Sequence, residues 1–393
     1  MLSRPGLLRR TASPHTSLDD VEVDGSGGVV GVVSGGLPPL YVAATDEGPA
    51  APRASDVDIG GGLPTADDDG GGGAAAGGDG RLPSVTPPPF GRRSHSWGAI
   101  ARAALGELVG VAVFVLFTNS AAIVATVARP DSSLLDVTLI SGLGLALAIL
   151  IAGPRSGAHL NPALSFAVCL FRKNGLPLWE LPVFVVSQLL GGMLGAGLAL
   201  ALYRSPIRLF EAVNGIVRGE AGSSVTATAF YCTFPASSVR TPVLSASAVE
   251  AAGGATTVAW PDATVSTGTA FLSEALGTCI LTLIVSAVLD ARAVVHINHE
   301  TAVRAIAIGL TLFVLEVVLA PLSSACVNPA RDLGPRLVAA AAGWGRIAFP
   351  GERGGWWVFL VAPFVGAPIG VLLYDWVLSG AMEETAVAEQ KNK

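Results

Sequence analysis

Residues 156–163 read SGAHLNPA and residues 328–336 read NPARDLGPR, and these two stretches decide the fold. Each contains an Asn-Pro-Ala triplet: Asn161, Pro162 and Ala163 in the first, Asn328, Pro329 and Ala330 in the second. A glutamate lies inside the apolar stretch upstream of each triplet, and Glu107 and Glu274 precede their asparagines by the same 54 residues (161 − 107 and 328 − 274). The matched spacing indicates two related halves. Repeats that are interrupted at corresponding places indicate a site at the membrane midplane.

The composition indicates a protein that crosses a membrane several times. Of the 393 residues, 51% are hydrophobic and 14% are charged, and the apolar residues concentrate after residue 97. A membrane span needs about 20 apolar residues. The spans are predicted near residues 100–127, 137–152, 181–203, 267–289, 305–320 and 356–377. Six such stretches argue against a soluble protein with a buried core. The second and fifth are short, and we expect a half-helix directly after each.

The chain divides by composition into a tail, a membrane domain and a short end. Residues 1–96 are rich in Gly, Pro, Asp and Ala and predict disorder, because they cannot bury enough apolar surface to offset ordering. Residues 97–380 form the membrane domain, and residues 381–393 a short C-terminal tail. The domain comprises a first repeat at about 100–203, a long loop at 204–266 and a second repeat at about 267–378.

An even number of spans places both termini on one side of the membrane. Basic residues such as Arg92, Arg93 and Arg102 flank the first span, which favours cytoplasmic termini and an extracellular long loop. The plasma membrane is the expected location.

Each triplet has the residues of a helix start. Asn is a favoured N-cap, and Pro is suited to the first helical position, where its missing N–H is not needed. We therefore expect half-helices at 162–171 and 329–340 whose caps use the amide oxygen and leave the amide N–H groups free. The positive ends of both half-helices would face the membrane centre and repel cations. A water molecule that accepts hydrogen bonds from both asparagines could not easily pass a proton to the next water.

The residues before each triplet predict a row of carbonyl acceptors. Non-helical backbone at membrane depth is tolerated where it is buried in protein or lines a water-filled cavity. The predicted carbonyl lining comprises Gly157, Ala158, His159, Ser324 and Cys326. A polar stripe on an apolar wall suits water or a small polyol. The two glutamates are either proton relays or acceptors for backbone N–H groups of the broken loops, and their matched spacing favours the second role.

Both signature stretches resemble those of the major intrinsic proteins, and most closely the aquaglyceroporin branch. The resemblance covers about residues 100–378 and includes the AGWG of residues 342–345. It implies an all-α membrane fold with six tilted helices and two half-helices, arranged as an inverted repeat around one pore per subunit, and a homotetramer. Asp332 is typical of the glycerol branch, and Arg336 lies four residues later, so an i,i+4 ion pair is expected.

The resemblance also places the narrowest constriction at Ser141, Glu316, Ala325 and Arg331. Glycerol channels usually carry aromatic residues at two of these positions, whereas this chain has small or acidic residues beside Arg331. Arginine forks onto carboxylates, so a pair between Glu316 and Arg331 would neutralise the constriction. Protonation of Glu316 at low pH would then free Arg331 and alter permeation. The alternative is that Glu316 faces another helix and satisfies a loop amide.

These features predict a passive channel for glycerol, urea, similar polyols and water that excludes protons and ions. The expected partners are these solutes and membrane lipid, without nucleic acid, cofactor or metal, and the protein is not expected to be an enzyme. Alternatives are a broad-selectivity or water-selective pore, a proton-coupled transporter that uses Glu107, Glu274 or Glu316, and a non-conducting scaffold. The four scattered cysteines predict no disulfide, and Cys326 is expected to flank the pore and react with mercurials.

Overall fold

The computed structural model describes residues 96–129, 131–172, 175–236, 240–243, 245–290, 300–351 and 353–378. The predicted tails at 1–96 and 381–393 lie outside these residues, apart from Ser96. Within the described residues, six helices are long and apolar enough to cross a membrane, which is the number of spans predicted. These are α1 (Trp97–Val127), α2 (Leu134–Ser156), α4 (Leu181–Leu202), α8 (Thr267–Leu289), α9 (Glu300–Ser323), and α11 (Trp356–Leu372) with its π-helical continuation η6 (Leu373–Leu378).

Two spans are longer than the sequence predicted. The helix α2 continues to Ser156 and α9 to Ser323, although the expected ends were near 152 and 320. Pro154 and Pro321 lie inside the last turns, where a proline removes few intrahelical hydrogen bonds. Both helices therefore run directly up to the broken loops that carry the triplets.

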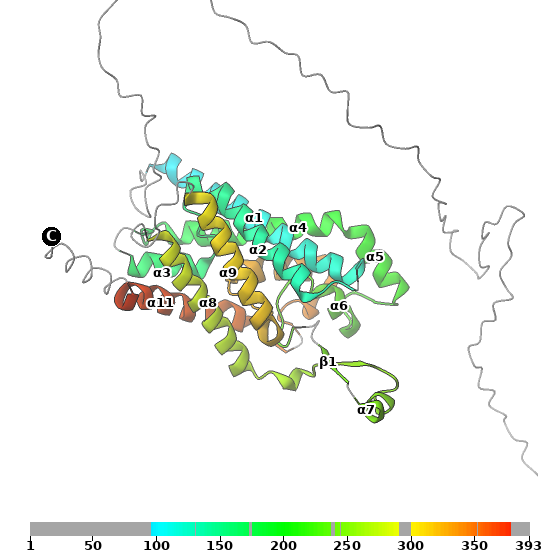
Figure 1. Ribbon diagram of the computed structural model, residues 1–393. Helices are drawn as coiled ribbons and strands as arrows, with labels where there is room; N and C mark the ends of the chain where they lie inside the picture. The colour runs from blue at the N-terminus through cyan, green and yellow to red at the C-terminus, as the bar shows by residue number, and fades with distance from the viewer. Residues whose placement is uncertain are drawn as a thin grey trace, which may run out of the picture. The chain divides into compact units, whose positions relative to one another are not determined.

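Two half-helices follow these loops. They are α3 (Pro162–Phe171) and α10 (Pro329–Ala339), and α10 leads into the short turns η4 (Ala340–Trp344) and η5 (Gly345–Ile347). In the first half α1 packs against α2 and α4, and in the second α8 packs against α9 and α11. Each half-helix also packs against the last long helix of the other half: α10 against α4, and α3 against α11 (Figure 1). The two halves are therefore interlocked.

The helices α2 and α9 cross where two glycines face each other. Gly142 and Gly309 are 167 residues apart (309 − 142), as are the two triplet asparagines (328 − 161). A Cβ atom at either glycine would meet the backbone carbonyl oxygen of the other. Small residues allow this close approach in a membrane, where lipid provides no hydrophobic drive for helix association. Glycines four residues apart occupy the equivalent contacts of α4 on α1 and of α11 on α8: Gly191 and Gly195, Gly366 and Gly370.

The segment between α4 and α8 contains local structure that the sequence did not predict. It holds α5 (Arg204–Val213), η2 (Ala221–Ser223), α6 (Ser224–Ala227), α7 (Ala246–Ala251) and η3 (Asp262–Thr264). The strands β1 (Arg240–Pro242) and β2 (Thr257–Ala259) pair antiparallel, so the described part of the chain is all-α apart from one small hairpin. The hairpin and α7 project away from the long helices (Figure 1). By contrast, Arg353 holds the segment around Phe234 close to the starts of α8 and α11. Its side chain donates hydrogen bonds to the carbonyls of Phe234 and Val265.

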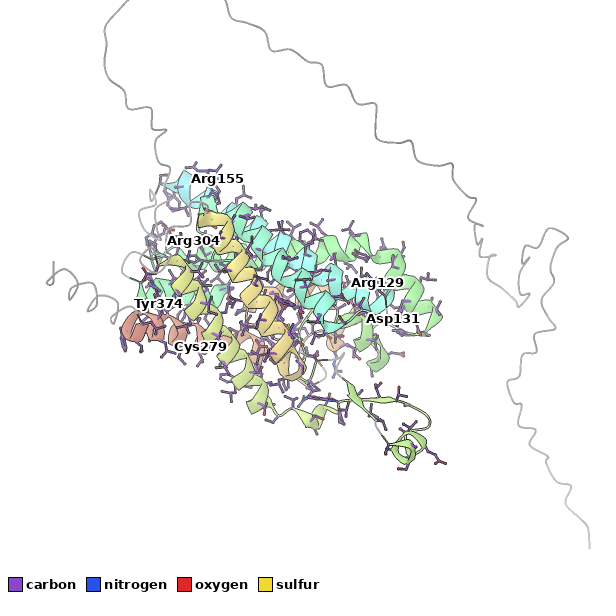
Figure 2. All side chains as sticks on the ribbon, viewed as in Figure 1. Arg129, Asp131, Arg155, Cys279, Arg304 and Tyr374 are labelled. Atoms are coloured by element: carbon purple, nitrogen blue, oxygen red, sulfur yellow. The ribbon has the colours of Figure 1, made fainter. Side chains whose placement is uncertain are left out.

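Polar residues mark both ends of the long helices. Arg155, Arg304 and Tyr374 lie towards one end, and Arg129 and Asp131 towards the other (Figure 2). At the first end, Arg172 forms an ion pair of 3.1 Å with Asp375, and the Tyr374 hydroxyl donates to Asp290 at 3.0 Å. These contacts join α3 and the end of α8 to η6.

Candidate functional site

Both triplets begin a half-helix in the way the sequence predicts. The side-chain oxygen of Asn161 accepts the backbone N–H of Ala163 at 2.9 Å, and that of Asn328 accepts the N–H of Ala330 at 3.0 Å. A proline occupies the first helical position in each case. The caps satisfy backbone donors that a helix start otherwise leaves without a partner.

The two asparagines also bind each other's loops. The amide nitrogen of Asn161 donates to the carbonyl of Val327 at 2.8 Å, and that of Asn328 donates to the carbonyl of Leu160 at 2.8 Å. A primary amide has two N–H groups. We expected all the amide N–H groups to be free, and this is wrong for one N–H of each asparagine. The bond that this N–H donates joins the two halves of the chain. One N–H of each amide is outside these bonds.

The loops before the triplets have an unusual backbone. Ala158 and Leu160 in the first loop have φ angles of 52° and 51°, and Ala325 and Val327 in the second have 46° and 45°. Residues other than glycine rarely adopt such left-handed conformations, which persist only where the surroundings impose them.

Buried carboxylates supply part of that support. Glu107 accepts the backbone N–H groups of His159 at 2.9 Å and Leu160 at 2.6 Å. Glu274 accepts those of Cys326 at 2.9 Å and Val327 at 2.7 Å. Both side chains are fully buried. These are the bonds expected of glutamates that hold the broken loops.

The first loop has further support that the sequence did not indicate. The amide nitrogen of Gln188 donates to Glu107 at 2.7 Å and to the Ser165 hydroxyl at 2.9 Å. The His159 ring lies 3.1 Å from the same hydroxyl through Nδ1. Gln188 is on α4 and fully buried, and only its place inside an apolar span distinguished it in the sequence.

A cavity of about 460 Å³ ends at the paired asparagines. Four of the five residues predicted as the carbonyl lining contact it, namely Gly157, Ala158, His159 and Cys326, and so do the two capping residues Asn161 and Asn328. Its other walls are mostly apolar and include Phe114, Leu145, Leu281 and Ile308, with Arg155 and Arg304 at the far end. Ser324, the fifth residue of the predicted carbonyl lining, is not among the residues that line this cavity in the described part of the chain. Its hydroxyl bonds to the backbone N–H and carbonyl of Thr233 at 3.0 and 2.8 Å.

The four residues of the expected constriction are not among the described residues that line this cavity. Ser141 and Glu316 nevertheless meet: the Ser141 hydroxyl donates to the Glu316 carboxylate at 2.8 Å. Thr118 extends this buried network, with its hydroxyl 3.1 Å from that of Ser141. Thr118 on α1 was not predicted, and Ala325 lies buried in the second loop.

Arg331 does not form an ion pair with Glu316, which was one of the two arrangements that the sequence left open. Within the described residues, no ion pair joins them, and the buried Nε and Nη1 atoms of Arg331 have no hydrogen-bond partner. Buried donors of this kind are costly unless a ligand or water accepts from them. Arg331 thus presents N–H groups to the interior.

Asp332 and Arg336 form the expected i,i+4 pair, and it is almost completely buried. Arg336 donates to both oxygens of Asp332 at 2.8 Å through Nε and Nη2. The pair also holds the segment around Cys232: Asp332 accepts the Cys232 N–H at 2.9 Å, and Arg336 donates to the Cys232 carbonyl at 2.8 Å. The guanidinium lies 4.2 Å from the centre of the Tyr231 ring. The pair therefore joins α10 to the long loop as well as stabilising the half-helix.

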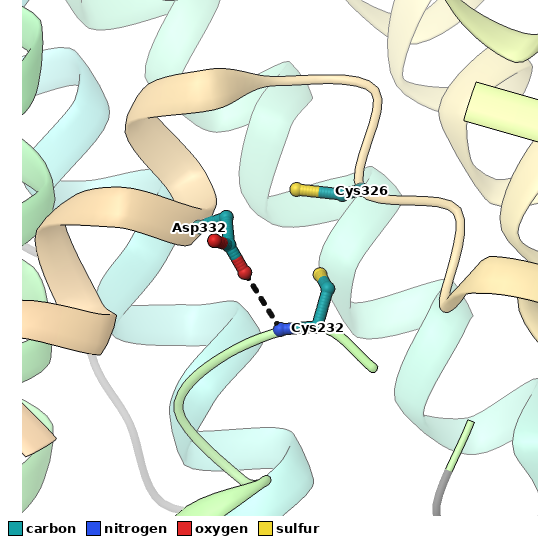
Figure 3. Close-up of side chains that lie close together, drawn as sticks. All are labelled: Cys232, Cys326 and Asp332. Carbon is teal, nitrogen blue, oxygen red and sulfur yellow. Dashed lines mark hydrogen bonds between the residues drawn. The ribbon is translucent and has the colours of Figure 1, made fainter. Parts of the chain in front are cut away.

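The structure brings together two cysteines that are far apart in sequence. The ligand atoms of Cys232, Cys326 and Asp332 lie within 4.8 Å of one another, and all three residues are buried (Figure 3). The sequence predicted neither a thiol pair nor a metal site, because 94 residues separate the cysteines (326 − 232).

Comparisons with known proteins agree on one family. The family model described as major intrinsic protein matches residues 94–374. Human Aquaporin-10 is 32% identical over 277 residues, which cover 70% of this chain and 80% of that protein. The glycerol uptake facilitator protein of Pseudomonas aeruginosa is 32% identical over 268 residues, or 68% and 85%. The X-ray structure of the aquaglyceroporin from Plasmodium falciparum has the same fold, with a TM-score of 0.57 at 23% identity over 72% of this chain and 99% of that one.

Proposed function

This chain belongs to the major intrinsic protein family, and we propose that it is a passive channel for glycerol and water. The family makes it a multi-pass membrane protein and a channel rather than an enzyme. Its similarity to a glycerol uptake facilitator and to human Aquaporin-10 supports glycerol and water as the two solutes that pass through it.

One observation carries the proposal. Two capped half-helices meet at asparagines that are bonded to each other's loops, and they do so at the end of a large cavity. The remaining amide N–H groups can donate to a hydroxyl or water, and the loop residues offer carbonyl acceptors on an otherwise apolar wall. Pore width, lining donors and half-helix dipoles are sufficient to select small neutral solutes.

We further propose that Arg331, Glu316, Ser141 and Ala325 form the constriction. The support is that Arg331 has buried donors without partners, while Ser141 and Glu316 form a polar wall. A solute that both accepts and donates hydrogen bonds, such as glycerol or urea, fits this combination. Exclusion of cations and protons follows from the positive ends of α3 and α10 and from Arg331.

The cellular arrangement is also a proposal. Basic residues around the first span favour cytoplasmic termini, and the plasma membrane is the proposed location. The long helices carry rows of exposed apolar side chains, including Leu139, Leu143 and Leu147 on α2. Lipid and neighbouring subunits of a homotetramer would cover these rows.

Stopped-flow light scattering on proteoliposomes tests the function. We expect faster water, glycerol and urea flux than in empty liposomes, equal in both directions and independent of a proton gradient. Asn328→Asp, which places a negative charge beside the second half-helix, should lower glycerol flux, whereas Glu250→Gln on the exposed helix α7 should not. Rates equal to those of empty liposomes would remove the channel proposal, and uphill flux driven by pH would favour a transporter.

A further inference from the structure

The thiols of Cys232 and Cys326 face each other across two segments of the chain. Their sulfur atoms lie within 4.8 Å of each other, beside the Asp332 carboxylate (Figure 3). Cys232 is 1% exposed and Cys326 is 2% exposed, so the pair is shielded from other proteins. Both thiols are free in this structure.

Hydrogen bonds hold the two segments in this position. Ser324 bonds twice to the backbone of Thr233, the next residue after Cys232. Cys232 itself is held at its N–H by Asp332 and at its carbonyl by Arg336. A disulfide requires cysteines whose backbones are already close, and these bonds keep them close whatever the state of the sulfurs.

Small molecules can approach the pair from either side. Cys326 lines the 460 Å³ cavity that ends at the asparagines. Cys232 lines a second cavity, of about 250 Å³, together with Tyr231, Phe234 and Trp260. A buried thiol pair next to a cavity is open to small neutral reagents and closed to large ones.

The surroundings disfavour a metal ion at this place. Both oxygens of Asp332 already accept hydrogen bonds from Arg336, and one also accepts from the Cys232 N–H. A cation bound by the two sulfurs would lie beside the buried guanidinium of Arg336, which no exposed solvent screens. The carboxylate is therefore a poor third ligand.

We propose that Cys232 and Cys326 are a reversible dithiol site that hydrogen peroxide oxidises to a disulfide. The sulfur of the Cys326 thiol attacks one peroxide oxygen, the O–O bond breaks, and the departing hydroxide takes up the thiol proton and leaves as water. This step forms a sulfenic acid on Cys326. The sulfur of Cys232 then attacks that sulfur, the S–S bond forms, the S–O bond breaks, and the second water carries away the proton of Cys232. The two thiols lose two electrons, which reduce one peroxide to two waters.

The oxidation has a direct consequence at the pore. The Cys326 thiol donates a hydrogen bond to the carbonyl of Asn328 at 3.3 Å. A disulfide sulfur has no hydrogen, so this bond is lost when the pair is oxidised. Oxidation of the cysteine pair therefore removes a hydrogen bond at the second triplet.

Counting thiols in the purified full-length chain in detergent tests the proposal. The chain has four cysteines. After treatment with hydrogen peroxide, quenching with catalase and denaturation, we expect two free thiols, and dithiothreitol should restore all four. Peptide mapping should recover a linked peptide that joins residues 232 and 326 within one chain.

Variants make the test specific. In the Cys169→Ser/Cys279→Ser variant, which removes the two cysteines of membrane helices, the count should fall from two to zero. Adding Cys232→Ser should abolish the intrachain link. A count that peroxide leaves unchanged, a loss that dithiothreitol does not restore, or a link between other cysteines would overturn the proposal. So would a stoichiometric metal ion that is lost on substitution of either cysteine. Because no flux is measured, failure here is distinct from failure of the channel function.

Discussion

Replacing Glu274 with glutamine should weaken the second broken loop by a predictable amount. The two carboxylate oxygens each accept a different backbone N–H, from Cys326 and Val327. Glutamine keeps one acceptor oxygen and places an NH₂ group where the other was, so one loop N–H faces a donor. A hydrogen bond to a charged group contributes about 1.5–3 kcal/mol, which is the expected loss in the free energy of unfolding.

The corresponding change at Glu107 should cost more. This carboxylate accepts three donors, the N–H groups of His159 and Leu160 and the side-chain amide of Gln188. A glutamine there must lose at least one of these bonds and faces another amide on the side of Gln188. Because up to two hydrogen bonds to a charged group are lost, we expect a loss of about 3–6 kcal/mol.

Unfolding midpoints in detergent and glycerol flux in proteoliposomes measure both effects. We expect the order wild type, Glu274→Gln, Glu107→Gln in falling stability, with glycerol flux falling in parallel because the loops position the asparagines. The control is Glu250→Gln on α7, where the glutamate is exposed. If Glu274→Gln and Glu107→Gln are as stable and as permeable as this control, the carboxylates do not hold the loops and our interpretation fails.

Three other changes test separate contacts. Arg336→Ala leaves Asp332 buried and unpaired and should cost about 3–5 kcal/mol in unfolding measurements, while the double variant Arg336→Ala/Asp332→Ala should recover part of it. Gly309→Ala places a methyl group against the carbonyl of Gly142 and should destabilise the chain by about 1–3 kcal/mol; Gly197→Ala, which meets nothing within 4 Å, is the matched control. If Glu316 lines the constriction, wild-type glycerol flux changes between about pH 4 and pH 8 and the Glu316→Gln flux does not; flat flux in both would contradict this.

The number and order of the spans could be predicted from the sequence because length and hydropathy alone determine which segments cross a membrane. The half-helix α3 also begins and ends at the predicted residues, since Asn161 and Pro162 specify a helix start locally. Span ends were less predictable. The second and fifth spans were predicted to end near residues 152 and 320, whereas α2 and α9 continue past Pro154 and Pro321 up to the broken loops.

In the candidate site, too, some residues could be predicted from the sequence and others could not. Glu107 and Glu274 were identifiable because their spacing to the asparagines repeats, and repetition is visible in a sequence. Gln188, Thr118 and the thiol pair were not, because each depends on which side chains tertiary packing brings together. Glu316 shows the limit most clearly: the family resemblance raised Arg331 as one possible partner, whereas packing of α9 on α2 gives it Ser141.

The reciprocal asparagine bonds show that the two triplets do more than cap their own half-helices. A cap needs only its own half-helix, but Asn161 donates to Val327 and Asn328 donates to Leu160, each in the other half of the chain. The carbonyls that accept these bonds belong to residues with left-handed φ angles, and their own N–H groups are held by the buried glutamates. Each asparagine is therefore oriented by a glutamate of the opposite repeat acting through one residue. A change at Glu274 should consequently disturb Asn161 as well as Asn328, so damage to either loop reaches both donors at the centre of the pore.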